Sequence, residues 1–393
     1  MNQQAFVSST RKIPDDVTVR ENLGLLGELA GTWRGDGFNL IARPDFRDRA
    51  NLYLQLNQTR ETLTIMPIGS AIPNRGFGQD DIALFGLSYL QKIDDHHTGG
   101  CLHVEPGVWI TQPGTTYPRQ YPPPPDGQII ARMASIPHGS AVLAQGNATR
   151  FTGPPTLQPQ DWIERYSGSR FPSFNSTPFP ADGPVINADG SSEKETAKQV
   201  GAEPFDQYDL SFAESEDNPR TPFATDPSEP DPPERIGDVP MQDVINDPIR
   251  LLQAVIETQK ADECTFEGSA LNIATQAPVT FRVRSDSPLT GPTVNVWLND
   301  AAGGIENILF LEGGKPTGDQ GPNAKAGLVY ATFWIEEVTP KSGAPFMQLQ
   351  YAQMAVLNFA VYKLLHPSDQ GTPSRLVKMG WPHVSVATLQ KAS

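Results

Sequence analysis

Short stretches in which apolar and polar residues alternate constrain this chain more than any other feature. The stretch NLYLQLNQTRETLTIMP places Leu52, Leu54 and Leu56 at every second position, and CLHVEPGVWI spaces its aliphatic residues in the same way. A period of two is typical of β-strands with one buried face. Neither end of the chain has the strand-helix-strand spacing of a parallel sheet. The sequence therefore predicts an all-β, mainly antiparallel protein.

Six further segments near the C-terminus read as strands bounded by Gly, Pro, Asn or Asp. They are SALNIATQ, VNVWLND, IENILFLEGG, GLVYATFWIEEV, MQLQYAQMAVLNF and PHVSVATLQK. Helical periodicity is confined to VTVRENLGLLGELAGTW, where Val19, Leu23 and Leu26 share a face, and to MQDVINDPIRLLQAVIETQ, where Asp247 and Pro248 open the main body of the helix. We therefore expect one or two short helices packed against a sheet.

The middle of the chain differs from both flanks. Of the 38 prolines, 16 lie between residues 151 and 250, next to acidic stretches such as AESEDNP and DPSEPDPPERIGD. Prolines remove ladder donors, and a segment poor in aliphatic residues buries too little apolar area to offset chain entropy. We predict a first β-rich part (1–150) with a short N-terminal helix, a Pro-rich acidic insertion (151–255) that wraps the fold, and a second β-rich part (256–393). The two β-rich parts form either two small barrels or one barrel split by the insertion.

Charge and targeting signals narrow the choice of partner. The formal net charge of -15 repels phosphate backbones and anionic membrane surfaces, which leaves a small molecule as the expected partner. The chain contains no apolar run of membrane-spanning length and no secretion signal at its start, so we expect a cytoplasmic protein without a membrane partner. Cys101 and Cys264 lack CxxC spacing, and we expect two reduced, buried thiols.

Common enzyme motifs are missing, because the chain has no GxSxG elbow, P-loop, HExxH or strand-linked GxGxxG. Histidines are the remaining chemical candidates. The tip of a polar hairpin contains His96 and His97 beside two aspartates, where a solvated loop competes with an adventitious metal site. His138 and His366 lie in predicted loops. The sequence therefore directs attention to His103 and His383, which lie in predicted strands.

Both strand histidines have informative neighbours. His103 shares a strand face with Glu105 and Trp109, opposite an aliphatic face, and the fold decides which face is turned inward. His383 is followed on its own face by Ser385 and Ala387, small residues that leave room above a flat ligand. The alternative for His383 is a satisfied structural histidine.

Four segments, in order, resemble elements of the nitrobindin family, heme-binding β-barrels related in shape to fatty-acid-binding proteins and lipocalins. The segments are LGELAGTWRGDGF, LHVEPGVWI, MQLQYAQMAVLNF and WPHVSVATLQK. The family's Gly-x-Trp-x-Gly strand and its LH-x-E-x-G strand are matched by Gly31, Trp33, Gly35, Leu102, His103, Glu105 and Gly107. The resemblance covers both β-rich parts but not the middle of the chain, and family members are usually less than half this length.

The resemblance implies one closed lipocalin-like barrel of about ten strands, in which His383 is the proximal ligand of a heme b iron. It also implies a function in sensing or acting on small oxidants and gases such as nitric oxide, peroxynitrite or peroxide, with heme-dependent isomerase or peroxidase-like turnover. The candidate cofactor-binding residues are His383, Trp33, His103, Trp109, Trp334 and Tyr351.

Two alternatives remain open at this point. The first is a carrier or non-heme barrel enzyme for a hydrophobic small molecule, in which the aromatic residues line the pocket and His383 or Glu105 performs acid-base work. The second concerns Trp33, which instead of lining a pocket plugs the end of the barrel. A Soret band in the purified protein separates a heme protein from a carrier.

Overall fold

The protein is described from a computed structural model. The structure describes residues 16–45, 50–74, 82–111, 128–136, 140–157, 179–180, 185–187, 192–193, 210, 235–275, 277–285, 294–302, 304–307, 325–362 and 375–392.

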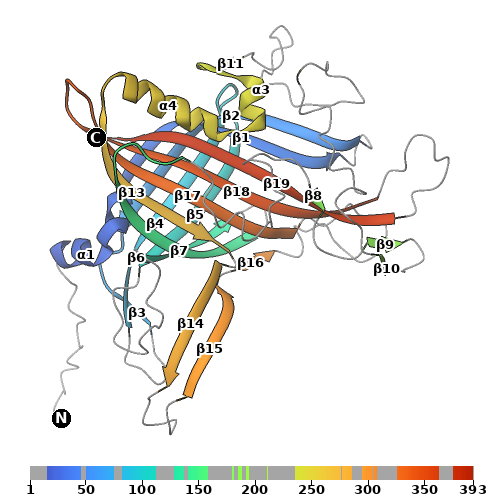
Figure 1. Ribbon diagram of the computed structural model, residues 1–393, viewed down its shortest axis with the longest axis horizontal. Coiled ribbons are helices and arrows are strands. Elements are labelled where there is room, and N and C mark those ends of the chain that lie inside the picture. Colours follow the sequence, from blue (N-terminus) through green and yellow to red (C-terminus); the bar gives the residue numbers. More distant parts are fainter. Residues whose placement is uncertain are drawn as a thin grey trace, which may run out of the picture.

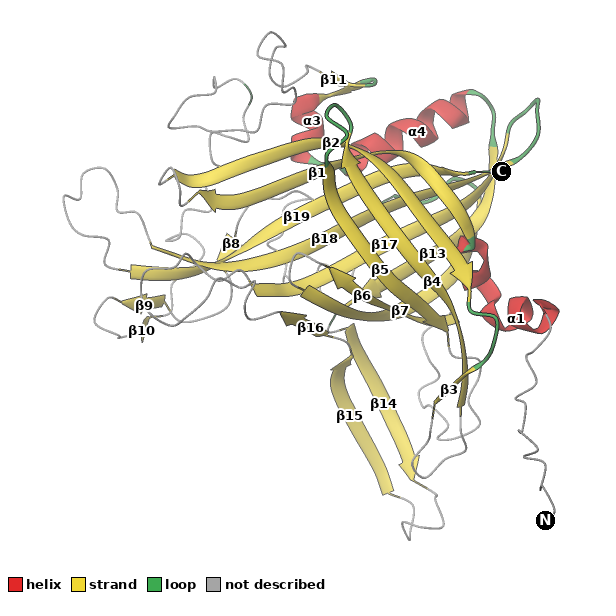
Figure 2. Ribbon diagram, turned by 180° about the vertical axis from the view of Figure 1, so that it is seen from behind, coloured by secondary structure: helices red, strands yellow, loops and turns green. Residues whose placement is uncertain are grey.

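Ten long strands form one closed antiparallel barrel (Figures 1 and 2). In barrel order they are β1 (Gly31–Asp45), β2 (Ala50–Pro67), β4 (Ile82–Asp95), β5 (Cys101–Thr111), β6 (Gln128–Ile136), β7 (Ser140–Thr152), β13 (Thr265–Ala274), β17 (Lys325–Thr339), β18 (Phe346–Tyr362) and β19 (Arg375–Lys391). Pairing of β1 with β19, from Trp33 opposite Lys391 to Ile41 opposite His383, closes the barrel. The prediction of an all-β, mainly antiparallel barrel of about ten strands is confirmed.

The remaining strands are short or stand apart from the barrel. Four short strands pair with barrel strands: β3 (Ile72–Asn74) with β4, β16 (Gly304–Asn307) with β7, and both β8 (Phe179–Pro180) and β9 (Val185–Asn187) with β19. Strand β10 (Ser192–Glu193) pairs with β9. Strands β11 (Arg235–Ile236) and β12 (Val239–Pro240) form a small hairpin. The predicted strand VNVWLND belongs to β15 (Val294–Ala302), which pairs with β14 (Ala277–Ser285) in a separate two-stranded sheet.

Two apolar clusters stabilise the barrel, one on each face of the sheet. The inner cluster receives at least one buried residue from each barrel strand: Trp33, Leu63, Leu87, Trp109, Ile130, Ala144, Leu271, Phe333, Tyr351 and Leu389. The outer cluster joins α3 (Met241–Asn246) and α4 (Ile249–Ala261) to six of the strands, with Leu252, Ile256, Val384 and Val386 among its members. Figures 1 and 2 show α4 lying across the outside of the barrel. Among the described residues, the outer face of the sheet is therefore buried beneath α3 and α4.

One end of the barrel is closed by the N-terminal segment, α1 (Asp16–Leu23) and the 3-10 helix η1 (Gly24–Leu29). The sequence predicts one helix here, but Gly24 adopts a φ of +53°, and Gln128 bonds to both sides of this break. A left-handed residue ends an α-helix, so a short stretch of tighter helix follows. Val19, Leu23 and Leu26, predicted to share a face, are buried in the inner cluster.

Three other expectations from the sequence differ from the structure or lie outside the residues that it describes. The predicted second helix is two helices that break at Asp247 and Pro248, and Asp247 Oδ1 accepts a bond of 3.3 Å from the Ile249 amide at the start of α4. Both cysteines are free, but Cys101 is exposed and Cys264 partly exposed, so the expectation of buried thiols is wrong. Most of the predicted insertion lies outside the described residues, and so does its expected wrapping of the barrel.

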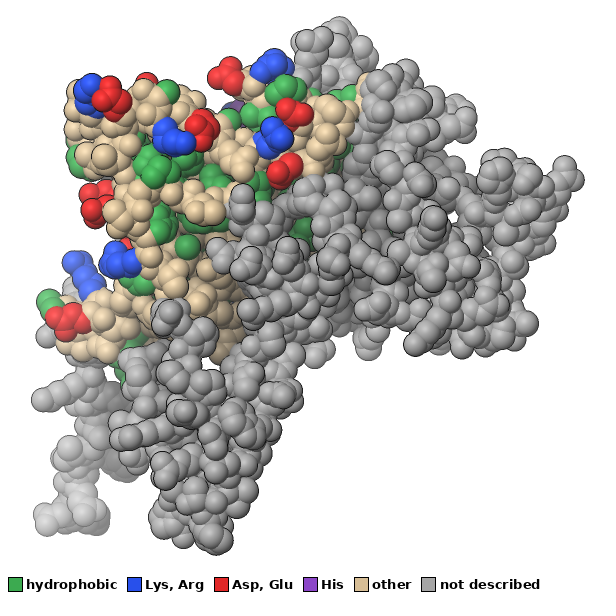
Figure 3. All heavy atoms as spheres, viewed as in Figure 1, with side chains coloured by type: hydrophobic (Ala, Val, Ile, Leu, Met, Phe, Trp, Pro, Cys, Tyr) green, Lys and Arg blue, Asp and Glu red, His purple; other side chains and the backbone are tan. Residues whose placement is uncertain are grey.

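Two surface properties complete the fold. Among the described residues, no helix has both the length and the apolar character needed to cross a membrane. On the face drawn in Figure 3, acidic and basic side chains alternate over the described part without gathering into a patch of one sign.

Candidate functional site

The inner face of the barrel changes character along β1, β18 and β19. At the end covered by η1, the inward-facing Trp33, Leu349 and Leu389 are fully buried. Farther along the same strands, five inward-facing residues are only partly buried: Ile41, Gln353, Ala355, His383 and Ser385. Trp381, two residues beyond His383 in β19, is 1% exposed. The outward-facing neighbours of the five residues, Met354 and Val384, are by contrast 1% and 0% exposed beneath the helices. At this level these inward-facing side chains are therefore more accessible than their outward-facing neighbours.

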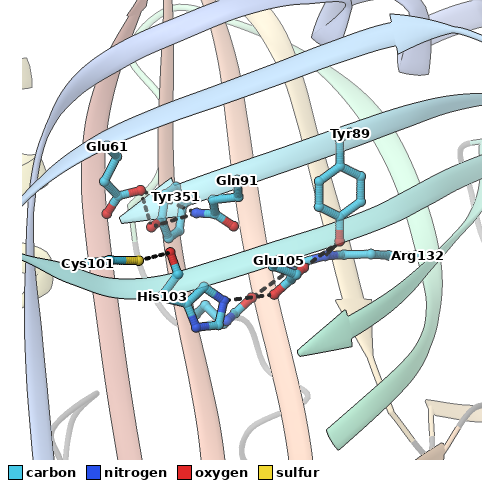
Figure 4. A network of polar contacts seen from close by, with 9 residues as sticks. Glu61, Tyr89, Gln91, Cys101, His103, Glu105, Arg132 and Tyr351 are labelled. Carbon is cyan, nitrogen blue, oxygen red and sulfur yellow. Dashed lines mark hydrogen bonds and ion pairs between the residues drawn. The ribbon is translucent and has the colours of Figure 1, made fainter. Parts of the chain in front are cut away.

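We call the region around Trp33 the closed half and the region around Ile41, Gln353, Ala355, His383 and Ser385 the accessible half. Buried polar side chains from β2, β4, β5, β6 and β18 lie between the two (Figure 4). They form a floor of two groups of interacting side chains, one around Arg132 and one around Glu61.

The first group is built on a buried ion pair. Arg132 donates from Nη2 to Glu105 and, at 2.8 Å, from Nε to the hydroxyl of Tyr89, which itself donates to Glu105. Its third nitrogen, Nη1, donates to Gln353 Oε1 at 2.7 Å and so connects the floor to the accessible half. His103 Nε2 lies 3.3 Å from the other oxygen of Glu105. The guanidinium also lies over aromatic rings, 5.4 Å from the centre of the Phe333 ring.

Charge complementarity fixes the protonation of this pair. Burial alone would raise the pKa of Glu105, but the charge of Arg132 and hydrogen bonds from His103 and Tyr89 lower that pKa to about 2. Burial likewise acts to lower the pKa of Arg132, and the charge of Glu105 outweighs it and raises the pKa above its usual value. Glu105 and Arg132 therefore stay ionised across the physiological pH range.

The second group holds a carboxyl group without a cation bonded to it. Glu61 is 1% exposed, and its Oε2 accepts bonds from the Tyr351 hydroxyl at 2.6 Å and from Gln91 Nε2 at 3.2 Å. Its Oε1 accepts a bond of 3.2 Å from Thr59. Burial raises the pKa of Glu61 to about 7, against the opposing effects of these hydrogen bonds and of His103. Glu61 therefore exchanges a proton near neutral pH.

The local sequence explains how Glu61 fits against β1. The strand carries glycine at 35 and 37, in register with Glu61 and Thr59 of β2. A Cβ at Gly37 would lie 2.8 Å from both Glu61 Oε1 and Thr59 Oγ1. A larger residue at 37 would therefore displace the carboxyl group.

The structure brings three of the six candidate residues together at the floor. His103 and Tyr351 belong to its hydrogen-bond networks, and Trp109 packs edge-on against Phe333 with ring centres 5.3 Å apart. The strand face that carries His103, Glu105 and Trp109 is thus the inner one, and the aliphatic face of the same strand is turned outward.

The two other candidate tryptophans, Trp33 and Trp334, lie away from the floor. Trp33 is in the closed half, where its Nε1 donates to the Leu29 carbonyl at 2.7 Å and Lys391 Nζ lies 5.2 Å from its ring centre. This is the placement of a residue that plugs the barrel end. Trp334 belongs to the outer cluster beneath α3 and α4, so it does not line the interior.

His383 lies in the accessible half. Register with Ile41 and Ala355 places it on the inner face, and its Nε2 lies 3.1 Å from the carbonyl oxygen of Ala42. A bond to a backbone carbonyl fixes which ring nitrogen carries the proton, so this contact makes Nε2 the donor.

No set of three or more metal-ligating side chains occurs in the part of the chain that the structure describes. His96 and His97 lie at the turn after β4, where His96 Nδ1 is 3.4 Å from Asp36 and His97 Nε2 is 3.0 Å from Gln58 Oε1. His138 and His366 fall outside the described residues. The adventitious metal site weighed for the hairpin tip thus finds no support in the geometry.

Sequence reasoning missed the residues that complete the floor: Glu61, Tyr89, Gln91 and Arg132. Polar groups at inward positions of alternating strands are the signal that identifies them, because such positions normally carry apolar residues. Reading that signal requires knowing which face of each strand is turned inward.

Comparisons with known proteins add little to this geometry. No protein-family model matches the chain, and no curated protein matches it. Among solved structures, Rv2717c from M. tuberculosis is similar at a TM-score of 0.31 and 10% sequence identity, over 95% of this chain and 98% of that chain. A likeness at that TM-score carries no argument about function.

Proposed function

We propose that this protein binds one small, largely apolar molecule in the accessible half of its barrel, as a carrier or as a non-heme barrel enzyme. The observation that carries the proposal is the reversed exposure of β18 and β19, where inward-facing residues are accessible and outward-facing ones are buried. A hollow lined by a few polar groups and closed at its base is the usual form of a small-molecule site.

The floor supports this proposal. Burying its polar groups costs free energy that an apolar core would not, and such a cost is expected where the groups serve binding. Ile41 and Ala355 provide apolar contact area in the wall, and Gln353 and Ser385 provide polar contacts. Glu61 can accept or release a proton near neutral pH, which is the property that acid-base chemistry on a bound molecule requires.

A site-filling variant tests this proposal. The neutral apolar dye Nile red should bind the wild-type protein with one-to-one stoichiometry and a blue-shifted emission. Ser385→Trp places a large side chain in the hollow and should abolish dye binding. Gln390→Trp is the matched control, because Gln390 is exposed on the same strand and faces outward. Equal dye binding by both variants would show that the dye does not occupy the accessible half.

Heme is the second candidate ligand, and a specific observation favours it. His383 lies on the inner face between small residues, Ala355 and Ser385, and its bond to a backbone carbonyl orients the ring in the manner common among metal-ligating histidines. These residues fit the role that the nitrobindin resemblance gives to His383. When bound, heme would supply an iron that takes up diatomic gases or peroxides.

Hemin titration separates the two candidates. A heme protein should develop a Soret band that saturates at one equivalent of hemin, and hemin should displace Nile red. A carrier without heme should bind the dye and show no saturable band.

A further inference from the structure

The polar groups of the site indicate what the ligand must present to them. The cationic candidate for receiving an anionic headgroup is Arg132, the one buried cation among the described residues. All three of its side-chain nitrogens already donate to protein oxygens, on Tyr89, Glu105 and Gln353. These bonds use three of the five N–H groups of the guanidinium. A carboxylate that replaced Glu105 would break a fully buried ion pair, which is strongly unfavourable, and one that bound beside Glu105 would meet its negative charge.

Elsewhere on the inner face, an acceptor oxygen lacks a donor in the part of the chain that the structure describes. Asn39 is 5% exposed, and its Oδ1 has no hydrogen-bond partner among the described residues. Register with Asn57 and Ser385 places Asn39 on the inner face, at the boundary between the floor and the accessible half. A buried oxygen without a donor costs free energy, and a ligand that supplies a donor recovers it.

The Glu61 carboxyl group approaches the inner face of the same strand two residues away. Gly37 is the next inward-facing residue of β1 before Asn39, and Glu61 Oε1 occupies the space where a side chain of Gly37 would be. Oε1 accepts a single bond, of 3.2 Å from Thr59, whereas Oε2 accepts two. Asn39 and Glu61 thus place two acceptor oxygens on one side of the site.

We propose that the polar end of the ligand is a hydrogen-bond donor, a hydroxyl or an amine, received by Asn39 Oδ1 and the Glu61 carboxyl group. This inference rests on the proposed function and adds the class of ligand to it: an apolar alcohol or amine, and not a fatty acid. The raised pKa of Glu61 is consistent with it, because an amine would bind more tightly as Glu61 ionises.

The test compares three ten-carbon probes that differ only in their polar end: decanol, decylamine and decanoate. Each probe is titrated against bound Nile red at pH 8. Decanol and decylamine should displace the dye at concentrations about tenfold lower than decanoate, the factor expected for one buried hydrogen bond. Lowering the pH to 6 should weaken decylamine relative to decanol, because Glu61 becomes protonated.

Variants of Asn39 identify the receiving group. Asn39→Leu removes the acceptor and should weaken decanol about tenfold, whereas Asn39→Asp keeps an acceptor and should preserve the preference for decanol over decanoate. Asn272→Leu is the matched control, because Asn272 lies on the outer face and its Oδ1 already accepts a bond from Thr332. If Asn39→Leu does not fold, Asn39→Ala replaces it.

The outcomes separate the two proposals. Equal or tighter binding of decanoate, or unchanged decanol affinity in Asn39→Leu, overturns the donor inference and leaves ligand binding itself standing. Failure of the dye and all three probes to bind overturns both. Dye binding that no probe displaces overturns the donor inference alone.

Discussion

The two halves of the barrel interior use the same strands for different purposes. In the closed half, Trp33, Leu349 and Leu389 pack with η1 into a dry apolar cluster. In the accessible half, the same strands present Gln353 and Ser385 inward, and Asn39 lies at the boundary with the floor. Because polar groups stabilise a core less than apolar ones of the same volume, the difference teaches that stability is concentrated in the closed half, whereas the ligand site that we propose lies in the other.

The floor between the halves contains both kinds of buried carboxyl group. Glu105 stays ionised because the positive charge of Arg132 stabilises its carboxylate. Glu61 is held only by hydrogen bonds and titrates near neutral pH. A third buried carboxyl group, Glu336, lies outside the barrel, bonded at 2.6 Å by Gln348. Burial raises the pKa of Glu336 to about 8. The three carboxyl groups are similarly buried but have different partners. The effect of each on stability can therefore be tested separately.

The largest expected effect comes from breaking the ion pair that separates the two halves. Arg132→Met leaves Glu105 buried without its cation, and we expect a loss of about 3 to 5 kcal/mol in the free energy of unfolding, measured by urea denaturation. The double variant Arg132→Met with Glu105→Gln should recover much of that loss, because no uncompensated charge then remains.

Arg150→Met is the control for this experiment, since Arg150 pairs with Glu28 at the surface with its side chain 67% exposed. A surface pair contributes little, so this variant should stay within about 1 kcal/mol of wild type. Equal losses in Arg150→Met and Arg132→Met would show that the buried pair does not stabilise the floor.

The closed half should respond to Trp33→Ala with a loss of about 3 kcal/mol in the free energy of unfolding, at the lower end of the range for removing a buried tryptophan. Below its unfolding transition, the variant should still bind Nile red with wild-type stoichiometry, because Trp33 lies away from the accessible half. Loss of dye binding from fully folded Trp33→Ala would contradict the division of the interior into two halves.

The architecture was predictable from sequence because it depends on periodicity alone. Alternation in β2, β5 and the C-terminal strands gave the all-β prediction, and the shared face of His103, Glu105 and Trp109 was identified before its direction was known. Which face of a strand is turned inward depends on what covers the other face. For β2 the cover is α4, which comes from a segment nearly two hundred residues downstream. Local sequence carries no information about that contact.

The strand β2 shows the consequence of this missing information. Its apolar residues occupy outward positions at Leu54 and Leu56, beneath the helices, and inward positions at Leu63 and Ile65, in the closed half. The alternation therefore changes phase within one strand, and the polar inward residues Thr59 and Glu61 lie where it changes. The same dependence on tertiary contacts explains why Trp334, a reasonable pocket residue from sequence, belongs to the outer cluster.

Changing pH should sharpen the contrast between the carboxyl groups. The folded-state pKa of Glu61 is about 7, above the ordinary value of 4.5, so the folded protein binds more protons than the unfolded chain between these values. Stability due to protonated Glu61 is therefore present at low pH and is lost as pH rises toward 7. From pH 5 to pH 7 we expect Glu61 to contribute a loss of about 2 kcal/mol in the free energy of unfolding, and Glu61→Gln should remove that contribution.

Glu267→Gln, at an exposed position of β13, is the control and should leave the pH slope unchanged. Glu336 acts in the same direction as Glu61 up to about pH 8, so part of the slope should persist in Glu61→Gln. Glu105 acts oppositely, because its lowered pKa gives stability that is lost only as pH falls from about 4 toward 2. A wild-type slope retained in full by Glu61→Gln would mean that Glu61 is already ionised at pH 5.

The smallest effect on stability should come from His383→Ala, in the accessible half. His383 is only partly buried, and the bond from its Nε2 to the Ala42 carbonyl is worth about 1 kcal/mol, so the variant should keep its strand content by circular dichroism and unfold within about 1 kcal/mol of wild type. Its effect on binding depends on the ligand. If heme is the ligand, the saturable Soret band should disappear, whereas a decanol site received by Asn39 and Glu61 should lose less than threefold in affinity. A variant that retains stoichiometric hemin would exclude His383 as the iron ligand, and one that loses both hemin and decanol would place His383 in the wall that every ligand contacts.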